Sequence, residues 1–191
     1  LGCAVQSIES RGSDSLVHCN EFSIAADWVI NCAGLTAPEL AADLGGAPEA
    51  YYAKGHYYSY AGRQPFSRLV YPVAEAGGLG VHVTLDLAGQ IKFGPDVRWL
   101  SEIDYSFDDS HKEEFATAIR AYFPGLDVSR LQPSYTGIRP KISGPNELAA
   151  DFMLYGPEQH GVAGRLNLLG IESPGLTASL ALAEAVADRI A

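Results

Sequence analysis

The sequence predicts a mixed α/β fold in which an α/β sheet is combined with a separate antiparallel sheet. Residues 28–34 form a short apolar run that ends in glycine, as buried parallel strands do. Beyond the first fifty residues, segments rich in aromatic and β-branched side chains alternate in polarity, as antiparallel strands do. The chain closes with an apolar segment of helical length at 175–190. With 191 residues, the chain has room for one or two ordinary domains.

The first fifty residues are expected to form a hairpin, a buried strand and a short helix. The expected elements are strands at 2–10 and 16–24 across a turn at 11–14, a strand at 28–34 and a helix at 37–44. Thr36 is expected to cap this helix, with Pro38 in its first turn. Two glycines then end it.

An antiparallel sheet and one helix are expected next. Asp-Leu-Ala-Gly at 86–89 is a hairpin turn signal. Phe115, Ile119 and Tyr122 recur at helical spacing and predict a helix over 108–123. The expected strands are 51–60, 68–73, 79–87, 90–94, a strand and loop over 130–142, and then 151–155 and 166–170.

The last helix, 175–190, follows Pro174 and is the clearest element. Its leucine, alanine, valine and isoleucine side chains lie nearly all round the helix, so we expect it to be buried.

The composition excludes several functions. A formal net charge of -10 argues against nucleic-acid binding, which needs a basic face. No apolar run reaches transmembrane length. Cys3, Cys19 and Cys32 are odd in number and lack a Cys-x-x-Cys spacing, so neither a disulfide framework nor a zinc site is expected, and no other metal site is expected either. A reducing, cytoplasmic location is therefore expected, and contact with a membrane surface stays open.

Three segments have features of a ligand site. Small residues close the strand at 30–34, so a ligand can approach its backbone at the carboxyl end of the strand. A Pro-Gly turn leads from strand to helix at 172–178, and the free N–H groups of a helix start favour negative charge. Arg139 stands beside Pro140, and its planar fork can hold a carboxylate. Each segment taken singly is better explained as ordinary structure.

Together and in this order, the segments resemble the D-amino-acid-oxidase-like superfamily of FAD-dependent oxidoreductases. This chain has Asn-Cys-Ala-Gly at 31–34, Gly-Ile-Arg-Pro at 137–140 and Ser-Pro-Gly-Leu-Thr at 173–177. The segments that are similar to the L-2-hydroxyglutarate dehydrogenase/oxidase branch are Lys-Gly-His-Tyr-Tyr at 54–58, Leu-Val-Tyr-Pro-Val at 69–73, Gly-Val-His-Val-Thr at 80–84 and Phe-Gly-Pro at 93–95.

One part of the family pattern is missing. The fingerprint Gly-x-Gly-x-x-Gly and the acidic residue that holds the adenosine ribose do not occur. The first residues read as the inside of a strand, without an initiator Met. We therefore expect residues upstream of Leu1, and FAD binding by this chain alone stays open.

The resemblance implies an FAD-binding, Rossmann-like domain made of residues 1–50 and 143–191, with an antiparallel substrate-binding domain of residues 51–142 between them. FAD is the implied cofactor, and the helix start at 175 would lie near the flavin edge that gains negative charge on reduction. The implied cofactor-binding residues are Val5, Ala33, Gly34, Arg139, Pro174, Gly175, Leu176 and Thr177.

The implied reaction is oxidation of a small 2-hydroxy acid, such as L-2-hydroxyglutarate, to the 2-oxo acid by hydride transfer to the flavin. Arg139 matches the arginine that holds the substrate carboxylate in amino-acid oxidases. A base must remove the hydroxyl proton, and a histidine suits that task. His82 is the first candidate and His56 the second, and a structural role stays open for each.

The pocket itself is expected to be lined by strand residues. Alternation puts His82 on the face that bears Thr84. The implied substrate-binding residues are Tyr57, Tyr71, Thr84 and Arg139, although strand tyrosines often serve packing alone. Lys54 and Lys141 are further candidates to offset the charge of a dicarboxylate.

Two alternatives stay open. In the first, the chain is a different member of the superfamily, one that oxidises glycine or another amino acid. In the second, it is a non-catalytic fragment with a binding function. The expected substrate is a small carboxylic acid, and the sequence does not choose among oxygen, a quinone and a carrier protein as the electron acceptor.

Overall fold

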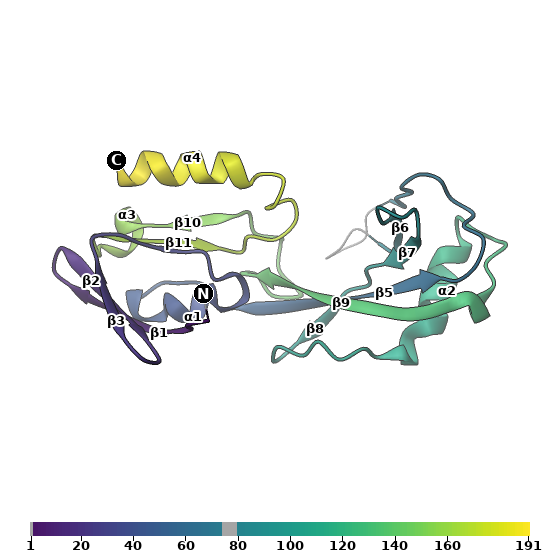
Figure 1. Ribbon diagram of the computed structural model, residues 1–191, viewed down its shortest axis with the longest axis horizontal. Coiled ribbons are helices and arrows are strands. Elements are labelled where there is room, and N and C mark those ends of the chain that lie inside the picture. Colours follow the sequence, from purple (N-terminus) through teal and green to yellow (C-terminus); the bar gives the residue numbers. More distant parts are fainter. Residues whose placement is uncertain (1, 74–79) are drawn as a thin grey trace. The chain divides into compact units, whose positions relative to one another are not determined.

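The computed structural model describes residues 2–73 and 80–191 and has the expected mixed α/β fold (Figure 1). The chain divides into two compact units. The first unit comprises Leu1–Tyr51 and Pro140–Ala191, and the second comprises Tyr52–Arg139. Within the described residues, none of the helices combines the length and the apolar character needed to cross a bilayer.

The first unit contains two small sheets and several helices. Its strands are β1 (Val5–Arg11), β2 (Asp14–Cys19), β3 (Ser23–Ala26), β4 (Val29–Asn31), β10 (Met153–Tyr155) and β11 (Arg165–Leu169). Its helices are η1 (Gly34–Thr36), α1 (Ala37–Leu40), η2 (Ala42–Leu44), α3 (Pro157–His160) and α4 (Ser179–Ile190). The expected hairpin is confirmed as β1 and β2, which β3 extends to an antiparallel sheet in the order β1-β2-β3.

The second sheet joins the two ends of the chain. Its order is β10-β11-β4, and β11 runs parallel to β4, so the expected parallel strand at 28–34 is confirmed. All five residues of β11 are buried. Arg165 is the largest of them, and its guanidinium forms two hydrogen bonds with Asp43, of 2.6 and 3.1 Å. The small core beside this sheet consists of Ala37, Ala41, Leu44, Tyr155 and Leu169.

The expectation for the last helix is wrong in part. Residues 175–178 form a turn, α4 begins at Ser179, and no residue of α4 is buried. A helix that lies on a three-stranded sheet can bury only one side. Even on that side Leu182, Ala183 and Val186 line an apolar hollow of about 390 Å³ with residues of β4 and β11.

Two smaller expectations are also wrong. Thr36 does not cap α1, because its hydroxyl instead donates to the carbonyl of Ala33. The expected strand at 68–73 is reduced to one bridge, between Val70 and Val83. Leu79, the first residue of the expected strand at 79–87, lies outside the described residues.

The second unit is one antiparallel sheet with a helix. Its elements are β5 (Tyr51–Tyr60), β6 (His82–Leu85), β7 (Ile91–Gly94), β8 (Arg98–Leu100), β9 (Leu131–Lys141), η3 (Asp109–His111), α2 (Lys112–Arg120) and η4 (Val128–Arg130). The strand order is β6-β7-β5-β8, and β9 also pairs with β5. The expected turn at 86–89 is confirmed, with a hydrogen bond of 2.9 Å from the Gly89 N–H to the Asp86 carbonyl.

Apolar side chains from the sheet and from α2 form the core of this unit. Its buried members are Tyr58, Tyr60, Val83, Ile91, Phe93, Phe115, Ala116, Ile119, Leu126 and Leu131. The aromatic rings pack edge to face, and those of Tyr58 and Phe115 lie 4.8 Å apart. The amphipathic pattern of α2 predicted this packing, because Phe115 and Ile119 face the sheet together.

A bulge interrupts the strand opposite β5. Tyr58 pairs with Phe93, and Lys54 pairs with Arg98, so the partner strand takes one residue more than β5 over the same stretch. The backbones approach closely there, since a Cβ on Gly94 would lie 2.4 Å from the carbonyl oxygen of His56. Glycine is required at Gly94 for that reason, and its φ of 145° also favours glycine.

Candidate functional site

The register of the antiparallel sheet of the second unit divides the candidate residues between its two faces. Tyr58 pairs with Phe93, which in turn pairs with Val83, so these three core side chains share one face. Their neighbours Tyr57 and His82 therefore point to the opposite face, which we call the His82 face. The face covered by α2 is called the core face.

His82 has the geometry of a base. Its Nδ1 lies 3.1 Å from the carbonyl oxygen of Gly80, which can only accept a hydrogen bond. Nδ1 therefore carries the proton of the neutral ring, and Nε2 is left as the acceptor. Burial lowers the pKa of His82, and the bond to Gly80 offsets this in part. The imidazole is thus neutral at neutral pH, as a proton acceptor must be.

One tyrosine ring stacks on the base, and two others stack on each other on β5 and β9. The ring of Tyr71 stacks on His82 with 4.3 Å between centroids and an interplanar angle of 17°. On the neighbouring strands, Tyr57 stacks on Tyr135 at 4.5 Å. Burial, followed by the charge of Tyr135, raises the pKa of Tyr57 to about 12. Its hydroxyl is therefore a neutral donor at physiological pH.

Arg139 belongs to the same face. It lies four residues beyond Tyr135 in β9, and its charge acts to lower the pKa of Tyr57. Its guanidinium donates a long hydrogen bond of 3.5 Å to the backbone carbonyl of Asp96. This leaves most of its donors available, so Arg139 can grip a carboxylate on the face that bears His82.

His56, the second candidate for the base, lies on the core face. Its ring meets Phe107 edge to face at 5.1 Å, as does Tyr58, two residues along β5. Both its backbone N–H and its Nδ1 contact one carboxylate oxygen of Asp96, at 2.7 and 3.0 Å. The fold therefore separates His56 from His82 and ties it to the bulge.

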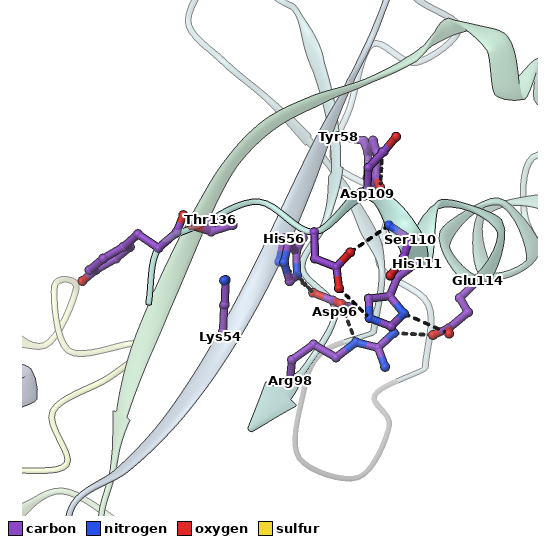
Figure 2. Close-up of polar contacts among 12 residues, drawn as sticks. Lys54, His56, Tyr58, Asp96, Arg98, Asp109, Ser110, His111, Glu114 and Thr136 are labelled. Carbon is purple, nitrogen blue, oxygen red and sulfur yellow. Dashed lines mark hydrogen bonds and ion pairs between the residues drawn. The ribbon is translucent and has the colours of Figure 1, made fainter. Parts of the chain in front are cut away.

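A chain of charged groups continues from this contact (Figure 2). Arg98 donates to the second oxygen of Asp96 at 3.0 Å and also pairs with Glu114 of α2. Glu114 in turn accepts from His111. Because this network joins the bulge to α2, its evident role is to fix the sheet against the helix.

The side chains of the remaining candidates already have partners within the protein. The Thr84 hydroxyl lies on the His82 face but already donates to the Lys92 carbonyl, at 3.3 Å. Lys54 is buried on the core side and pairs with Asp104 at 3.1 Å. Lys141 pairs with Glu172 at 2.5 Å in the first unit. Both lysines are therefore already neutralised by protein carboxylates.

Two residues of the His82 face were missed by the sequence analysis. Lys92 pairs with Thr84 across β6 and β7, and its Nζ lies 5.0 Å from the ring centroid of Tyr135. The turn at 86–89 already determined the Lys92 register, so alternation could have found it. Nothing local pointed to Tyr135, because the pairing of β9 with β5 is long-range.

In the first unit, the turn after β4 fits a ligand. The Asn31 side chain accepts from the Ala33 N–H at 3.1 Å and donates to the Ala37 carbonyl, which fixes the turn. Gly34 has a φ of 62°, and open space surrounds the position of its missing Cβ. Val5 lies in β1, at the edge of its sheet, where one side of the backbone has no partner strand.

The loop before α4 offers a second contact region. Residues 171–177 line a hollow of about 490 Å³. A Cβ on Gly175 would lie 2.6 Å from the carbonyl oxygen of Glu172, so only glycine fits. In the described structure, the N–H groups of Leu176 and Thr177 have no hydrogen-bond acceptor, whereas those of Gly175 and Ala178 do. Free N–H groups before a helix suit an anionic ligand edge.

Comparison with known proteins shows the family to which the chain belongs. A family model described as "FAD dependent oxidoreductase" (DAO) matches residues 1–189. The chain belongs to this family. The resemblance that the motifs predicted is thereby confirmed. The open space at Gly34 after β4 and the free N–H groups of Leu176 and Thr177 before α4 fit FAD, the cofactor of the family.

Curated relatives point to one branch of the family. The chain is 47% identical, over 95% of its length, to a protein named "L-2-hydroxyglutarate dehydrogenase, mitochondrial" from Arabidopsis thaliana, of which it covers 41%. It is 22% identical, over 98% of its length, to the L-2-hydroxyglutarate dehydrogenase of Indibacter alkaliphilus, of which it covers 56%. The chain thus spans only about half of the length of these relatives.

Solved structures confirm the fold. An L-alpha-glycerophosphate oxidase from Mycoplasma pneumoniae, solved with FAD bound, is similar with a TM-score of 0.75 and 24% identity, over 94% of this chain and 47% of that one. A glycine oxidase from Geobacillus kaustophilus is similar with a TM-score of 0.64 and 18% identity, over 88% of this chain and 42% of that one.

Proposed function

We propose that this protein oxidises a small L-2-hydroxy acid to the 2-oxo acid with FAD, and that L-2-hydroxyglutarate is its substrate. The observation that carries the proposal is that a neutral histidine and an arginine lie on the same face of one sheet. His82 keeps Nε2 free because Nδ1 is bonded to Gly80, and Arg139 lies on the same face. The identity of 47% to a protein of that name supports the choice of substrate.

The residues of the His82 face then have distinct roles. Arg139 holds the carboxylate next to the reacting carbon, and the neutral hydroxyl of Tyr57 donates a hydrogen bond to the substrate. Nε2 of His82 accepts the proton of the substrate hydroxyl as the hydride leaves the same carbon. When FAD is bound, its flavin supplies the acceptor for that hydride.

The two units have corresponding roles in the proposal. Val5, Ala33 and Gly34, together with the loop from Pro174 to Thr177, would hold FAD, and residues 51–142 would bind the substrate. His56 is proposed as a structural residue, since it contacts Asp96 on the core face. A cytoplasmic location stays a prediction.

The test is anaerobic reduction of the purified, full-length flavoprotein. L-2-hydroxyglutarate is expected to bleach the flavin bands, and D-2-hydroxyglutarate, the matched control, is expected not to. Bleaching by glycine or another amino acid alone would establish the alternative branch. A protein that takes up no FAD would refute the proposal and favour a binding function.

A second measurement on the reduced protein identifies the electron acceptor. Oxygen, a soluble quinone and an artificial carrier are added in turn, and the return of the flavin bands is timed. An acceptor that reoxidises the flavin within the time of one turnover is kinetically competent, and one that reoxidises it more slowly is excluded.

A further inference from the structure

Two cations stand on the His82 face without a partner carboxylate. Among the described residues, Lys54, Lys141 and Arg98 each form an ion pair, whereas Lys92 and Arg139 form none. The chain as a whole has a formal net charge of -10. The two cations lower the cost of bringing a negatively charged ligand to this face.

Each of the two cations acts on one ring of a stacked tyrosine pair. Nζ of Lys92 lies 5.0 Å from the ring centroid of Tyr135, and that ring stacks on Tyr57 at 4.5 Å. Tyr57 in turn lies within the electrostatic reach of Arg139. Along β9, Gly137 stands between Tyr135 and Arg139, and open space surrounds the position of its missing Cβ.

We propose that Lys92 binds the second carboxylate of a dicarboxylic substrate whose first carboxylate is held by Arg139. The pair thereby selects dicarboxylic over monocarboxylic 2-hydroxy acids. This inference rests on the proposed function and names the residue that sets its substrate class. Lys92 carries one charge for the second carboxylate, and neutral tyrosines separate it from Arg139, so a ligand with a charge at each end matches the face.

The test compares two non-reacting acids of equal length on the full-length holoenzyme, glutarate and pentanoate. Their dissociation constants are measured from the change in the flavin spectrum or by calorimetry. The unmodified protein is expected to bind glutarate at least about tenfold more tightly, as one hydrogen bond between charged groups provides. Lys92→Met is expected to abolish that preference and leave the affinity for pentanoate unchanged.

Lys112→Met is the matched control. Lys112 belongs to α2, and its Nζ lies 6.0 Å from the ring centroid of Tyr58 on the core face. The control thus removes the same charge from a similar position above a tyrosine, and it is expected to keep the preference for glutarate. Lys92→Arg, which retains the charge, is expected to keep it too.

The outcomes separate this inference from the proposed function. If L-2-hydroxyglutarate fails to bleach the flavin while Lys92→Met still abolishes the preference for glutarate, the proposed reaction is wrong and the dicarboxylate site stands. If the Lys92 and Lys112 variants both keep the preference, or if Lys92→Met weakens glutarate and pentanoate equally, the dicarboxylate site is refuted.

Discussion

Replacing His82 by asparagine removes the proposed base and the ring on which Tyr71 stacks, but it keeps the backbone contact of His82. The Nδ2 of asparagine reaches about as far as the Nδ1 of histidine, so the hydrogen bond to the Gly80 carbonyl, 3.1 Å in the structure, is retained. Nε2 is lost, and an amide cannot accept the proton. General-base catalysis contributes roughly 10²–10⁴-fold, or about 3–5 kcal/mol of the activation barrier. We expect kcat to fall by this factor while KM changes little, because Arg139 still holds the carboxylate.

The pH profile gives a second measurement on the same variant. Burial lowers the pKa of His82 from 6.5, so kcat/KM of the unmodified enzyme is expected to rise with pH, with the midpoint of the rise below pH 6.5. His82→Asn is expected to abolish this rise. Because the depressed pKa favours the neutral form in the folded state, the contribution of His82 to stability is present above pH 6.5 and is lost as the pH falls through the folded pKa.

Anaerobic stopped-flow reduction of the flavin is the assay, since it isolates the step that removes the proton. His18→Asn is the control, because His18 lies on β2 and contacts Ser23 and Glu9 at the surface. A loss of less than tenfold in His82→Asn, or an acidic limb that persists in this variant, would refute the assignment of the base.

Three further changes test the site and its support. Arg139→Lys keeps the charge but loses the planar fork, so steady-state kinetics should show KM for the hydroxy acid rising about tenfold. Asp43→Ala leaves the buried guanidinium of Arg165 bonded to the Leu40 carbonyl but without its carboxylate partner, so chemical denaturation should show a loss of about 3 kcal/mol, and Asp43→Ala with Arg165→Met should recover part of it. Gly94→Ala places a methyl group 2.4 Å from the His56 carbonyl oxygen, so thermal unfolding should show destabilisation by about 1–3 kcal/mol. An unchanged KM or an unchanged stability in any of these variants would contradict the corresponding contact.

Local patterns predicted the elements that depend on neighbouring residues. The turn at 86–89, the hairpin of β1 and β2 and the apolar side of α2 follow from turn residues and periodicity, and all three are confirmed. The last helix was expected to be buried because its composition is apolar. Burial depends on what packs against a helix, and periodicity carries no information about that.

The candidate site was predictable only as a set of residues. The family motifs singled out His82, Arg139 and the Pro-Gly loop, but they could not decide between His82 and His56. Lys92 was not singled out at all, although it pairs with Thr84 directly across a turn that the sequence predicted. The ion pairs of Lys54 and Lys141 join residues 50 and 31 positions apart, so alternation along one strand could not reveal them.

The sequence by itself determined the family, the kinds of element and the residue types that this chemistry needs. Only the tertiary structure decided which of those residues share a face. His82 and Arg139 are brought to one side by the pairing of β6, β7, β5 and β9, while His56 is turned to the other side. The physical reason is that a strand fixes only the alternation of its own side chains. The side on which they meet others is set by the long-range register between strands.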